Sequence, residues 1–197
     1  MNTKIVVDSS ASLYTLQGVD FECVPLKIIT DDAEYLDNGT MDAVGMAQTL
    51  RTYKGKTSTS CPNVSDWLAA YEGADEVYAI TITGTLSGSY NAAQLAAEEY
   101  QQENPGKRVF VLDSLSTGPE QRLLAEHLRD LLAEGKEFDE VCEDPVLMKQ
   151  CLHLLRLYPA LSLPKSHIPS PRQYLPASFR KILPSGLSLP VSAERPG

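Results

Sequence analysis

The stretch VYAITITGTLSGSYNAAQLAAEEY, residues 77–100, joins an apolar run to an alanine-rich segment through a turn of small hydroxyl residues. Residues 77–82 are rich in β-branched and aromatic side chains, which predicts a strand, and the spacing over residues 87–102 predicts a helix. The turn between them would present free N–H groups at the start of the helix, where the helix dipole adds partial positive charge. Such a turn is suited to bind an anion.

The same alternation of strand and helix runs through the first part of the chain. Further strands are expected over residues 4–7, 22–29 and 108–112, and further helices over residues 40–53, 62–71 and 119–134. Thr40 is the expected cap of the first of these helices, and Pro25 suits an edge strand or a bulge. The pattern predicts an α/β fold, with a mainly parallel sheet flanked by helices on both faces. Ligands of such sheets bind beyond the carboxyl ends of the strands.

Composition and charge exclude several classes of function. The 197 residues are 43% hydrophobic and 22% charged, as in a soluble globular protein, and the formal net charge is -9. Because so acidic a chain repels phosphate backbones, no nucleic acid partner is expected. Residues 1–10 contain neither a signal peptide nor a membrane span, so we expect a cytoplasmic protein. The four cysteines and three histidines have no metal-ligand spacing, and no metal site is predicted.

A second hydroxyl cluster, residues 56–63, precedes the helix that Pro62 is expected to open. Two such turns could hold one carboxylate between them. A hydroxyl that merely caps its own helix explains the turn with Ser87 equally well, and for residues 56–63 taken alone a cap is the commoner explanation. The glycines of GTLSGS match neither GxGxxG nor GxxxxGK[ST]. A small, singly charged group is therefore favoured over a nucleotide.

Two further strands end in an aspartate and a serine, at Asp8-Ser9 and Asp113-Ser114. An aspartate there can orient a hydroxyl or act as a base, but turn formation is the commoner role. No catalytic residue is predicted, because His127 lies in the middle of a helix and no GxSxG motif occurs. The alternative is a hydrolase or acyltransferase that uses Ser87 or Cys61.

Four stretches, in order, resemble motifs of the DegV family, a bacterial fatty-acid-binding group, over residues 1–153. They are KIVVDSS, KTSTSCP for the family's TSxP, ITGTLSGSYNAA for SSxLSGTYxxA, and VLDSLSTG for DSxxxSxG. In that family the threonine of TSxP and the serine of LSG hold a fatty acid's carboxylate, which implies Thr59 and Ser87, with backbone from Gly88. The expected set of ligand-binding residues also includes Ser60 and Ser89.

The resemblance implies a carrier rather than an enzyme. Its ligand would be a long-chain fatty acid, its partner a fatty-acid kinase that phosphorylates the bound carboxylate, and it would need no cofactor.

The composition changes after about residue 157. Residues 158–197 hold 8 of the 13 prolines, with one acidic residue against five basic ones, and the family's GRIS-like turn and second domain are not found there. We therefore expect a DegV-like domain over residues 1–155 and an irregular tail over residues 156–197, produced by a shifted reading frame or a misjoined gene, with the second domain missing or truncated. A genuine short paralogue with a disordered tail is the alternative.

Overall fold

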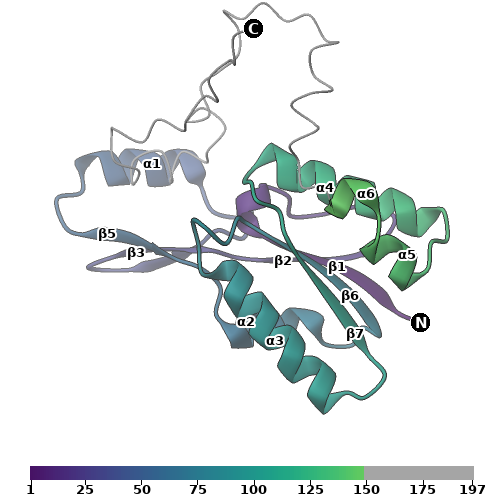
Figure 1. Cartoon of the computed structure of the whole chain (residues 1–197). Helices are drawn as coiled ribbons and strands as arrows, with labels where there is room; N and C mark the ends of the chain where they lie inside the picture. The colour runs from purple at the N-terminus through teal and green to yellow at the C-terminus, as the bar shows by residue number, and fades with distance from the viewer. Residues whose placement is uncertain (149–197) are drawn as a thin grey trace, which may run out of the picture.

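The computed structural model describes residues 1–148, which form a four-stranded parallel sheet with helices on both faces and a smaller sheet at one end (Figure 1). The strands of the larger sheet are β1 (Thr3–Asp8), β2 (Asp20–Val24), β6 (Glu76–Thr81) and β7 (Arg108–Asp113), in the order β2-β1-β6-β7. All three neighbouring pairs are parallel. The predicted fold class is confirmed. The expected tail, residues 156–197, lies outside the described residues.

Alternate residues of the central strands enter two separate cores. The larger sheet is covered by α2 (Val64–Tyr71) and α3 (Ser89–Glu103) on one face, and by α4 (Pro119–Ala133), α5 (Phe138–Cys142) and α6 (Pro145–Met148) on the other. In β1, Ile5 and Val7 pack with the residues of α4, whereas Val6 packs with those of α2 and α3. In β6, Ile80 and Ala79 divide in the same way. Both faces of each strand are therefore apolar, as a sheet covered on both sides requires.

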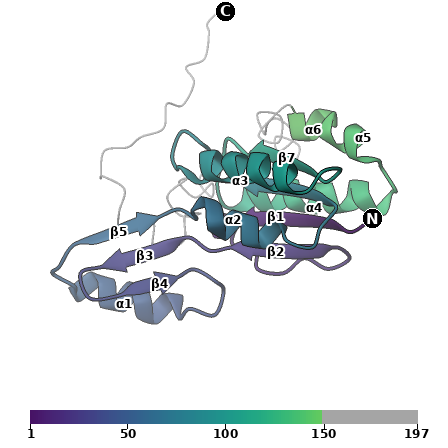
Figure 2. The same ribbon diagram turned by 90° about the horizontal axis from the view of Figure 1, so that it is seen from below.

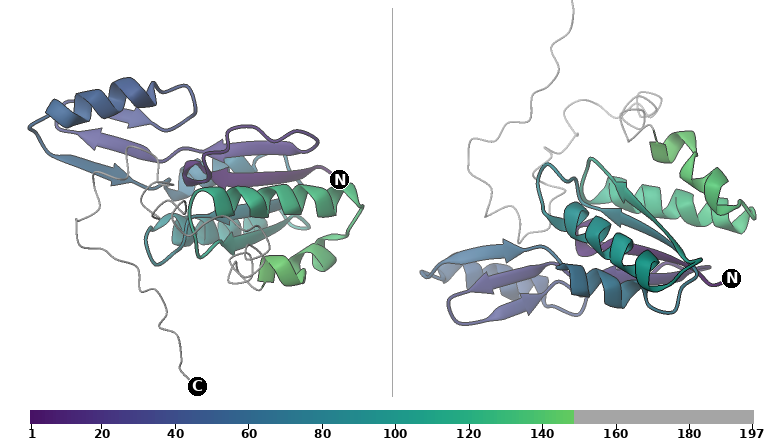
Figure 3. Two further views of the ribbon diagram at one scale, coloured as in Figure 1. Left: turned by 90° about the horizontal axis from the view of Figure 1, so that it is seen from above. Right: turned by 60° about the horizontal axis from the view of Figure 1, so that its bottom comes forward.

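The smaller sheet contains three antiparallel strands, β3 (Lys27–Thr30), β4 (Glu34–Leu36) and β5 (Thr57–Ser60), in the order β4-β3-β5. Helix α1 (Ala43–Thr52) covers one of its faces (Figure 2). Ile28, Met46 and Leu50 form its own small core. Figure 3 shows this unit extending from one end of the larger sheet.

The single strand predicted for residues 22–29 is wrong, because Pro25 separates β2 from β3 and the two strands belong to different sheets. Proline has no N–H to donate to a neighbouring strand. The next amide, that of Leu26, donates to Ser9 Oγ at 3.0 Å instead of continuing the ladder. The chain leaves the larger sheet at this point, so β2 remains its edge strand.

The predicted cap of the first helix is also wrong. Asp42 caps α1, and its Oδ1 accepts from Val44 N at 3.1 Å and from Gly45 N at 2.9 Å. Thr40 instead donates its hydroxyl to Asn38 Oδ1 at 2.8 Å. The sequence offers two good capping residues two positions apart, and only one of them can end the preceding loop.

Half of the second hydroxyl cluster, residues 56–63, forms a strand. Residues 57–60 form β5, in which Thr59 lies opposite Ile28 of β3. These residues have no alternation of apolar and polar side chains, so periodicity could not reveal the strand. Helix α2 then begins at Val64, and its N-cap, Asn63, forms a capping box with Asp66.

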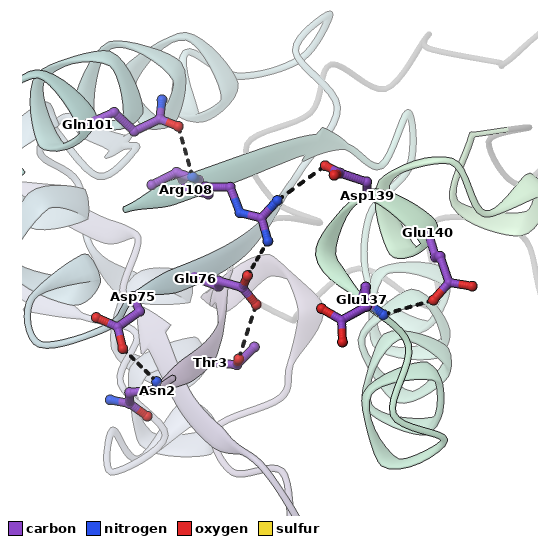
Figure 4. Close-up of polar contacts among 10 residues, drawn as sticks. Asn2, Thr3, Asp75, Glu76, Gln101, Arg108, Glu137, Asp139 and Glu140 are labelled. Carbon is purple, nitrogen blue, oxygen red and sulfur yellow. Dashed lines mark hydrogen bonds and ion pairs between the residues drawn. The ribbon is translucent and has the colours of Figure 1, made fainter. Parts of the chain in front are cut away.

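Charged side chains hold the amino ends of the strands together (Figure 4). Arg108, at the start of β7, pairs with Glu76 at the start of β6 and with Asp139 of α5 at 3.3 Å. Its guanidinium also lies 4.2 Å from the centre of the Phe138 ring. Thr3 Oγ1 donates to Glu76 at 3.4 Å. The charges of Arg108, Glu76 and Asp139 are therefore paired with one another at this edge of the sheet.

Replacement of Ile80 by valine tests the double-sided core. Ile80 is 1% exposed, so the loss of one methylene should lower the free energy of unfolding by about 0.5–1.5 kcal/mol. Val44 on α1 is 69% exposed, and Val44→Ala should change it by less than about 0.5 kcal/mol. Urea denaturation of both variants measures the difference, and equal effects would contradict this account of the core.

Candidate anion-binding site

Three turns meet at the carboxyl edge of the larger sheet. They follow β1, β6 and β7, and backbone hydrogen bonds join them directly. Thr83 N donates to Ser116 O at 2.9 Å, which connects the turn after β6 to the turn after β7. Gly118 N donates to Ser10 O at 3.0 Å, which connects the turn after β7 to the turn after β1. The three turns therefore form one continuous surface.

Helix α3 begins with unused backbone donors. Its N-cap is Gly88, which has no side chain to offer, and Ser87 Oγ accepts only from Ser89 N, at 3.3 Å. Among residues 1–148, no acceptor is found for the N–H groups of Gly88, Tyr90 and Asn91. Ser87 thus satisfies one amide and leaves the others free, where the dipole of α3 favours a negative charge.

The second hydroxyl cluster lies against this helix start. A Cβ added to Gly88 would be 3.3 Å from Cys61 Sγ, so the chain that leaves β5 passes directly beside the N-cap of α3. Thr59 and Ser60, at the end of β5, are both partly buried, and Ser60 Oγ donates to Cys61 O at 3.1 Å. The structure therefore brings the segment of Thr59 and Ser60 next to the segment of Ser87 and Gly88.

Ser89 occupies a different position, inside the protein. It is fully buried, and its hydroxyl donates to Asp8 Oδ2 at 2.7 Å. Asp8 is also fully buried and accepts from Ile82 N at 2.8 Å and from Gln121 Nε2 at 3.1 Å, and its Oδ1 forms a hydrogen bond of 2.5 Å with Ser10 Oγ. Burial raises the pKa of Asp8, while these four hydrogen bonds act in the opposite direction. A strand-end aspartate was expected to orient a hydroxyl, to act as a base or to form a turn. Asp8 is placed to orient hydroxyls, because it is hydrogen-bonded to those of Ser10 and Ser89.

Asp113, at the end of β7, stabilises the turns. Both of its carboxylate oxygens accept from Gly84 N at 3.2 Å, and Oδ1 also accepts from Leu115 N at 2.9 Å. Leu115 has a φ of 47°, in the left-handed region that a leucine rarely adopts. Turn formation, the commoner expectation for an aspartate after a strand, describes this residue.

Sequence reasoning did not find Gln121, which joins Asp8 to α4. Gln121 is fully buried on the same face of α4 as Leu124, Ala125 and Leu128. The sequence does place a glutamine at an apolar position of this amphipathic helix. Because a buried amide needs hydrogen-bond partners, this position could have indicated a buried polar contact.

Neither proposed nucleophile is hydrogen-bonded to a base among residues 1–148. Within the described part of the chain, no acidic or histidine side chain bonds to the Ser87 hydroxyl or the Cys61 thiol. His127 Nε2 instead pairs with Asp144 Oδ1 at 3.0 Å, between α4 and the start of α6. Residues 1–148 contain no cluster of three His, Cys, Asp or Glu side chains able to hold a metal ion. The same residues contain no helix long and apolar enough to cross a membrane.

An open depression between α2 and the far end of α3 is a weaker candidate. It is lined in part by Leu68, Tyr100 and Lys107, but Glu72 and Glu103 also face it. Two carboxylates disfavour an anionic ligand, and α3 is about 20 Å long at 1.5 Å per residue, so the depression is far from the hydroxyl segments.

Residues 2–155 match the family model described as uncharacterised protein, DegV family. This chain belongs to the DegV family. A DegV domain-containing protein of Streptococcus pneumoniae is 40% identical over 147 residues, which are 73% of this chain and 52% of that protein. The predicted resemblance is confirmed.

Two solved DegV structures are similar to this chain over the same region. A DegV family protein from Eubacterium eligens, loaded with heptadecanoic acid, is 40% identical with a TM-score of 0.69, over 71% of this chain and 51% of its own. The fatty acid kinase (Fak) B3 protein of Streptococcus pneumoniae, loaded with linoleic acid, is 39% identical with a TM-score of 0.70. This match covers 73% of this chain and 52% of that protein. This DegV chain therefore spans about half the length of the relatives that it matches.

A Gly84→Ala substitution tests the close packing of the turns in this DegV chain. The added Cβ would lie 3.2 Å from Asp113 Oδ2 and 3.3 Å from the Tyr90 ring, so the carboxylate must move away from the Gly84 amide. We expect a loss of about 1 kcal/mol in the free energy of unfolding, measured by guanidinium denaturation. Leu86→Ala in the same turn is the control, because Leu86 is half exposed, and it should have little effect. A Gly84→Ala protein as stable as the control would contradict the assigned packing.

Proposed function

We propose that this protein is a fatty-acid-binding carrier that holds the ligand's carboxylate between the two hydroxyl segments at the start of α3. The contacts would come from the hydroxyls of Thr59 and Ser87 and the backbone of Gly88, with Ser60 beside them. The observation that carries the proposal is the approach of Cys61, which follows β5, to the uncapped start of α3. The bound heptadecanoic and linoleic acids of the two solved relatives support it.

Neutral donors at this edge suit a singly charged ligand. Among the described residues, no lysine or arginine side chain forms a hydrogen bond or ion pair with the three turns or with residues 59–61. Hydrogen bonds to a charged group contribute about 1.5–3 kcal/mol each, so two hydroxyls and free amides suffice for one carboxylate. A phosphate group with more charge would favour additional cations.

The acyl chain would supply most of the affinity, at about 0.8 kcal/mol for each buried methylene. Leu86 and Leu115, in the turns after β6 and β7, are 50% and 47% exposed at the same edge of the sheet. We propose that these side chains begin the apolar surface on which the chain lies. The hydroxyls would then fix the ligand's orientation rather than its total binding energy.

Ser89 has a supporting part in this proposal. Because its hydroxyl donates to Asp8 inside the protein, it holds the first turn of α3 in place, next to Ser87 and Gly88. We therefore assign the direct ligand contacts to Ser87, to the backbone of Gly88 and to the end of β5.

The carrier would present the bound carboxylate to a fatty-acid kinase in the cytoplasm. Similarity to the fatty acid kinase (Fak) B3 protein supports this partner. The lack of a base bonded to Ser87 or Cys61 in the described structure favours a carrier over a hydrolase or acyltransferase.

Substitution of the two hydroxyl residues tests the head-group site. Ser87→Ala and Thr59→Val should each weaken binding of a long-chain fatty acid about 10- to 100-fold, because each removes a hydrogen bond to a charged group. Thr85→Ala is the matched control, since Thr85 is an exposed hydroxyl in the same turn and should leave the affinity unchanged. Displacement of a fluorescent fatty acid measures all three affinities.

The methyl ester of the same fatty acid distinguishes carboxylate binding from adsorption to apolar surface. It should bind the unaltered protein more weakly than the acid and should bind the Ser87→Ala variant equally weakly. Failure of the folded, unaltered protein to bind the acid would overturn the proposal. Hydrolysis of an activated ester that disappears in Ser87→Ala or Cys61→Ala would favour the enzyme instead.

A further inference from the structure

Three polar groups under the candidate site form a closed ring of contacts. Ser10 Oγ lies 2.5 Å from Asp8 Oδ1 and 2.6 Å from Gln121 Oε1, and Gln121 Nε2 lies 3.1 Å from Asp8 Oδ1. All three side chains are at most 1% exposed, so solvent cannot supply a missing donor from outside. Each of the three contacts needs one hydrogen atom between its two heavy atoms.

The ring has one contact more than its neutral donors can supply. The Ser10 hydroxyl has a single hydrogen, and the Gln121 amide directs its nitrogen at only one of its two neighbours in the ring. Exchange of the amide oxygen and nitrogen does not change this count, because it moves the donor from Asp8 to Ser10 and leaves an oxygen facing Asp8. With an ionised Asp8, two hydrogens would serve three contacts, and two buried oxygens would face each other without a hydrogen between them.

We propose that Asp8 is a neutral, protonated carboxyl group in the folded protein and that it positions the start of α3 for anion binding. The acid proton completes the ring through Oδ1, while Oδ2 accepts from Ile82 N at 2.8 Å and from Ser89 Oγ at 2.7 Å. Every polar contact of Asp8 then has a donor and an acceptor. The positioning role rests on the function proposed above, but the protonation of Asp8 does not.

The surroundings of Asp8 favour the neutral form. Among the described residues, no cationic side chain bonds to Asp8, and the ionisable groups nearby include Cys23 of β2, Asp37 after β4, Asp113 of β7 and Glu120 of α4. Burial is the main cause that raises the pKa of the Cys23 thiol to about 12, so this group is neutral too. Asp113 accepts from backbone amides, Glu120 from Ser116 and Asp37 from Tyr14, so none of these groups provides a positive charge that would stabilise an ionised Asp8.

A neutral Asp8 does not repel an anion bound close by, whereas an ionised one would. A second negative charge buried at the same edge would repel the ligand's carboxylate through a medium of low dielectric constant. The protonated group still accepts from Ser89 in the first turn of α3 and from the backbone of Ile82, just after β6. It thereby orients the turn that contains Ser87 at no electrostatic cost to binding.

The pH dependence of stability, compared between the unaltered full chain and Asp8→Asn, tests the protonation. The pKa of an aspartate in the unfolded chain is about 3.9, and the proposal places the folded value higher. Between those two pKa values the folded state binds one proton more than the unfolded state. The contribution of Asp8 to the free energy of unfolding therefore falls as pH rises. The asparagine variant cannot ionise, and all other titrating groups are shared, so the difference between the two proteins isolates Asp8.

We expect the ratio of the two folding equilibrium constants to change about tenfold per pH unit in favour of Asp8→Asn, from about pH 4 up to the folded pKa of Asp8. Urea denaturation without any fatty acid measures this ratio. A ratio that is constant from pH 4 to 8, or that changes in favour of the unaltered protein, means that Asp8 is ionised and overturns the proposal. Because no ligand is used, the result is independent of whether the protein binds fatty acids.

The infrared spectrum needs no variant and keeps the test of protonation decisive if Asp8→Asn does not fold, whereas fatty acid binding by the variants tests the positioning role. The infrared spectrum of the unaltered protein at pH 7 should contain a protonated carboxyl band that shifts on labelling with carboxyl-¹³C aspartate, and its absence would overturn the proposal. Among variants that fold, Asp8→Asn should retain more fatty acid binding at pH 7 than Asp8→Ala, which removes the acceptor for Ser89 and Ile82. Equal loss in both variants would contradict the positioning role.

Discussion

Both faces of the four-stranded parallel sheet are covered by helices, and this constraint determines where polar chemistry can occur in the protein. Successive residues of β1 and β6 enter opposite cores, so neither strand has a face on which a polar side chain could meet solvent. Polar groups are therefore concentrated at the two ends of the strands. The amino ends carry paired charges such as Arg108 and Glu76, and the carboxyl ends carry hydroxyls, glycines and aspartates.

The two ends achieve their polarity in different ways, which explains why only one of them suits a ligand. Charged side chains at the amino ends, such as Arg108 and Glu76, form ion pairs with one another, so little of their charge is available to a ligand. At the carboxyl ends, backbone donors of α3 have no partner in the described structure, and the nearby side chains are small. Fixed dipoles in an uncapped helix attract an anion without requiring a flexible cation to be ordered.

Much of the larger sheet could be predicted from the sequence, because β1, β6 and β7 contain continuous apolar runs and the helices that cover the sheet have the usual period. The strand β5 could not, because the residues Thr57 to Ser60 show no alternation and owe their conformation to pairing with β3. The division of residues 22–29 followed from the missing N–H of Pro25, which was visible, but the separate sheet was not. Local patterns do not specify which distant segment a strand will join.

For the candidate site, the sequence identified the hydroxyl segments but not the contacts that arrange them. Nothing in the spacing of Cys61 and Gly88 shows that they approach each other, since 27 positions and two elements separate them. The link from Asp8 to Gln121 spans a still longer stretch of chain. Both contacts depend on tertiary packing, which a single sequence does not encode in a readable local pattern.

The pairing of Lys27 with Ser60 has a consequence for how the chain folds. These two residues are the first of β3 and the last of β5, so the smaller sheet begins and ends at one point beside the larger one. Once the smaller sheet has formed, it closes the intervening loop and brings the end of β2 close to the start of α2. The remaining chain between β1 and β6 then behaves as a much shorter connection, and the entropy lost when these parallel strands pair is smaller. Early formation of this local antiparallel unit would accelerate assembly of the parallel sheet.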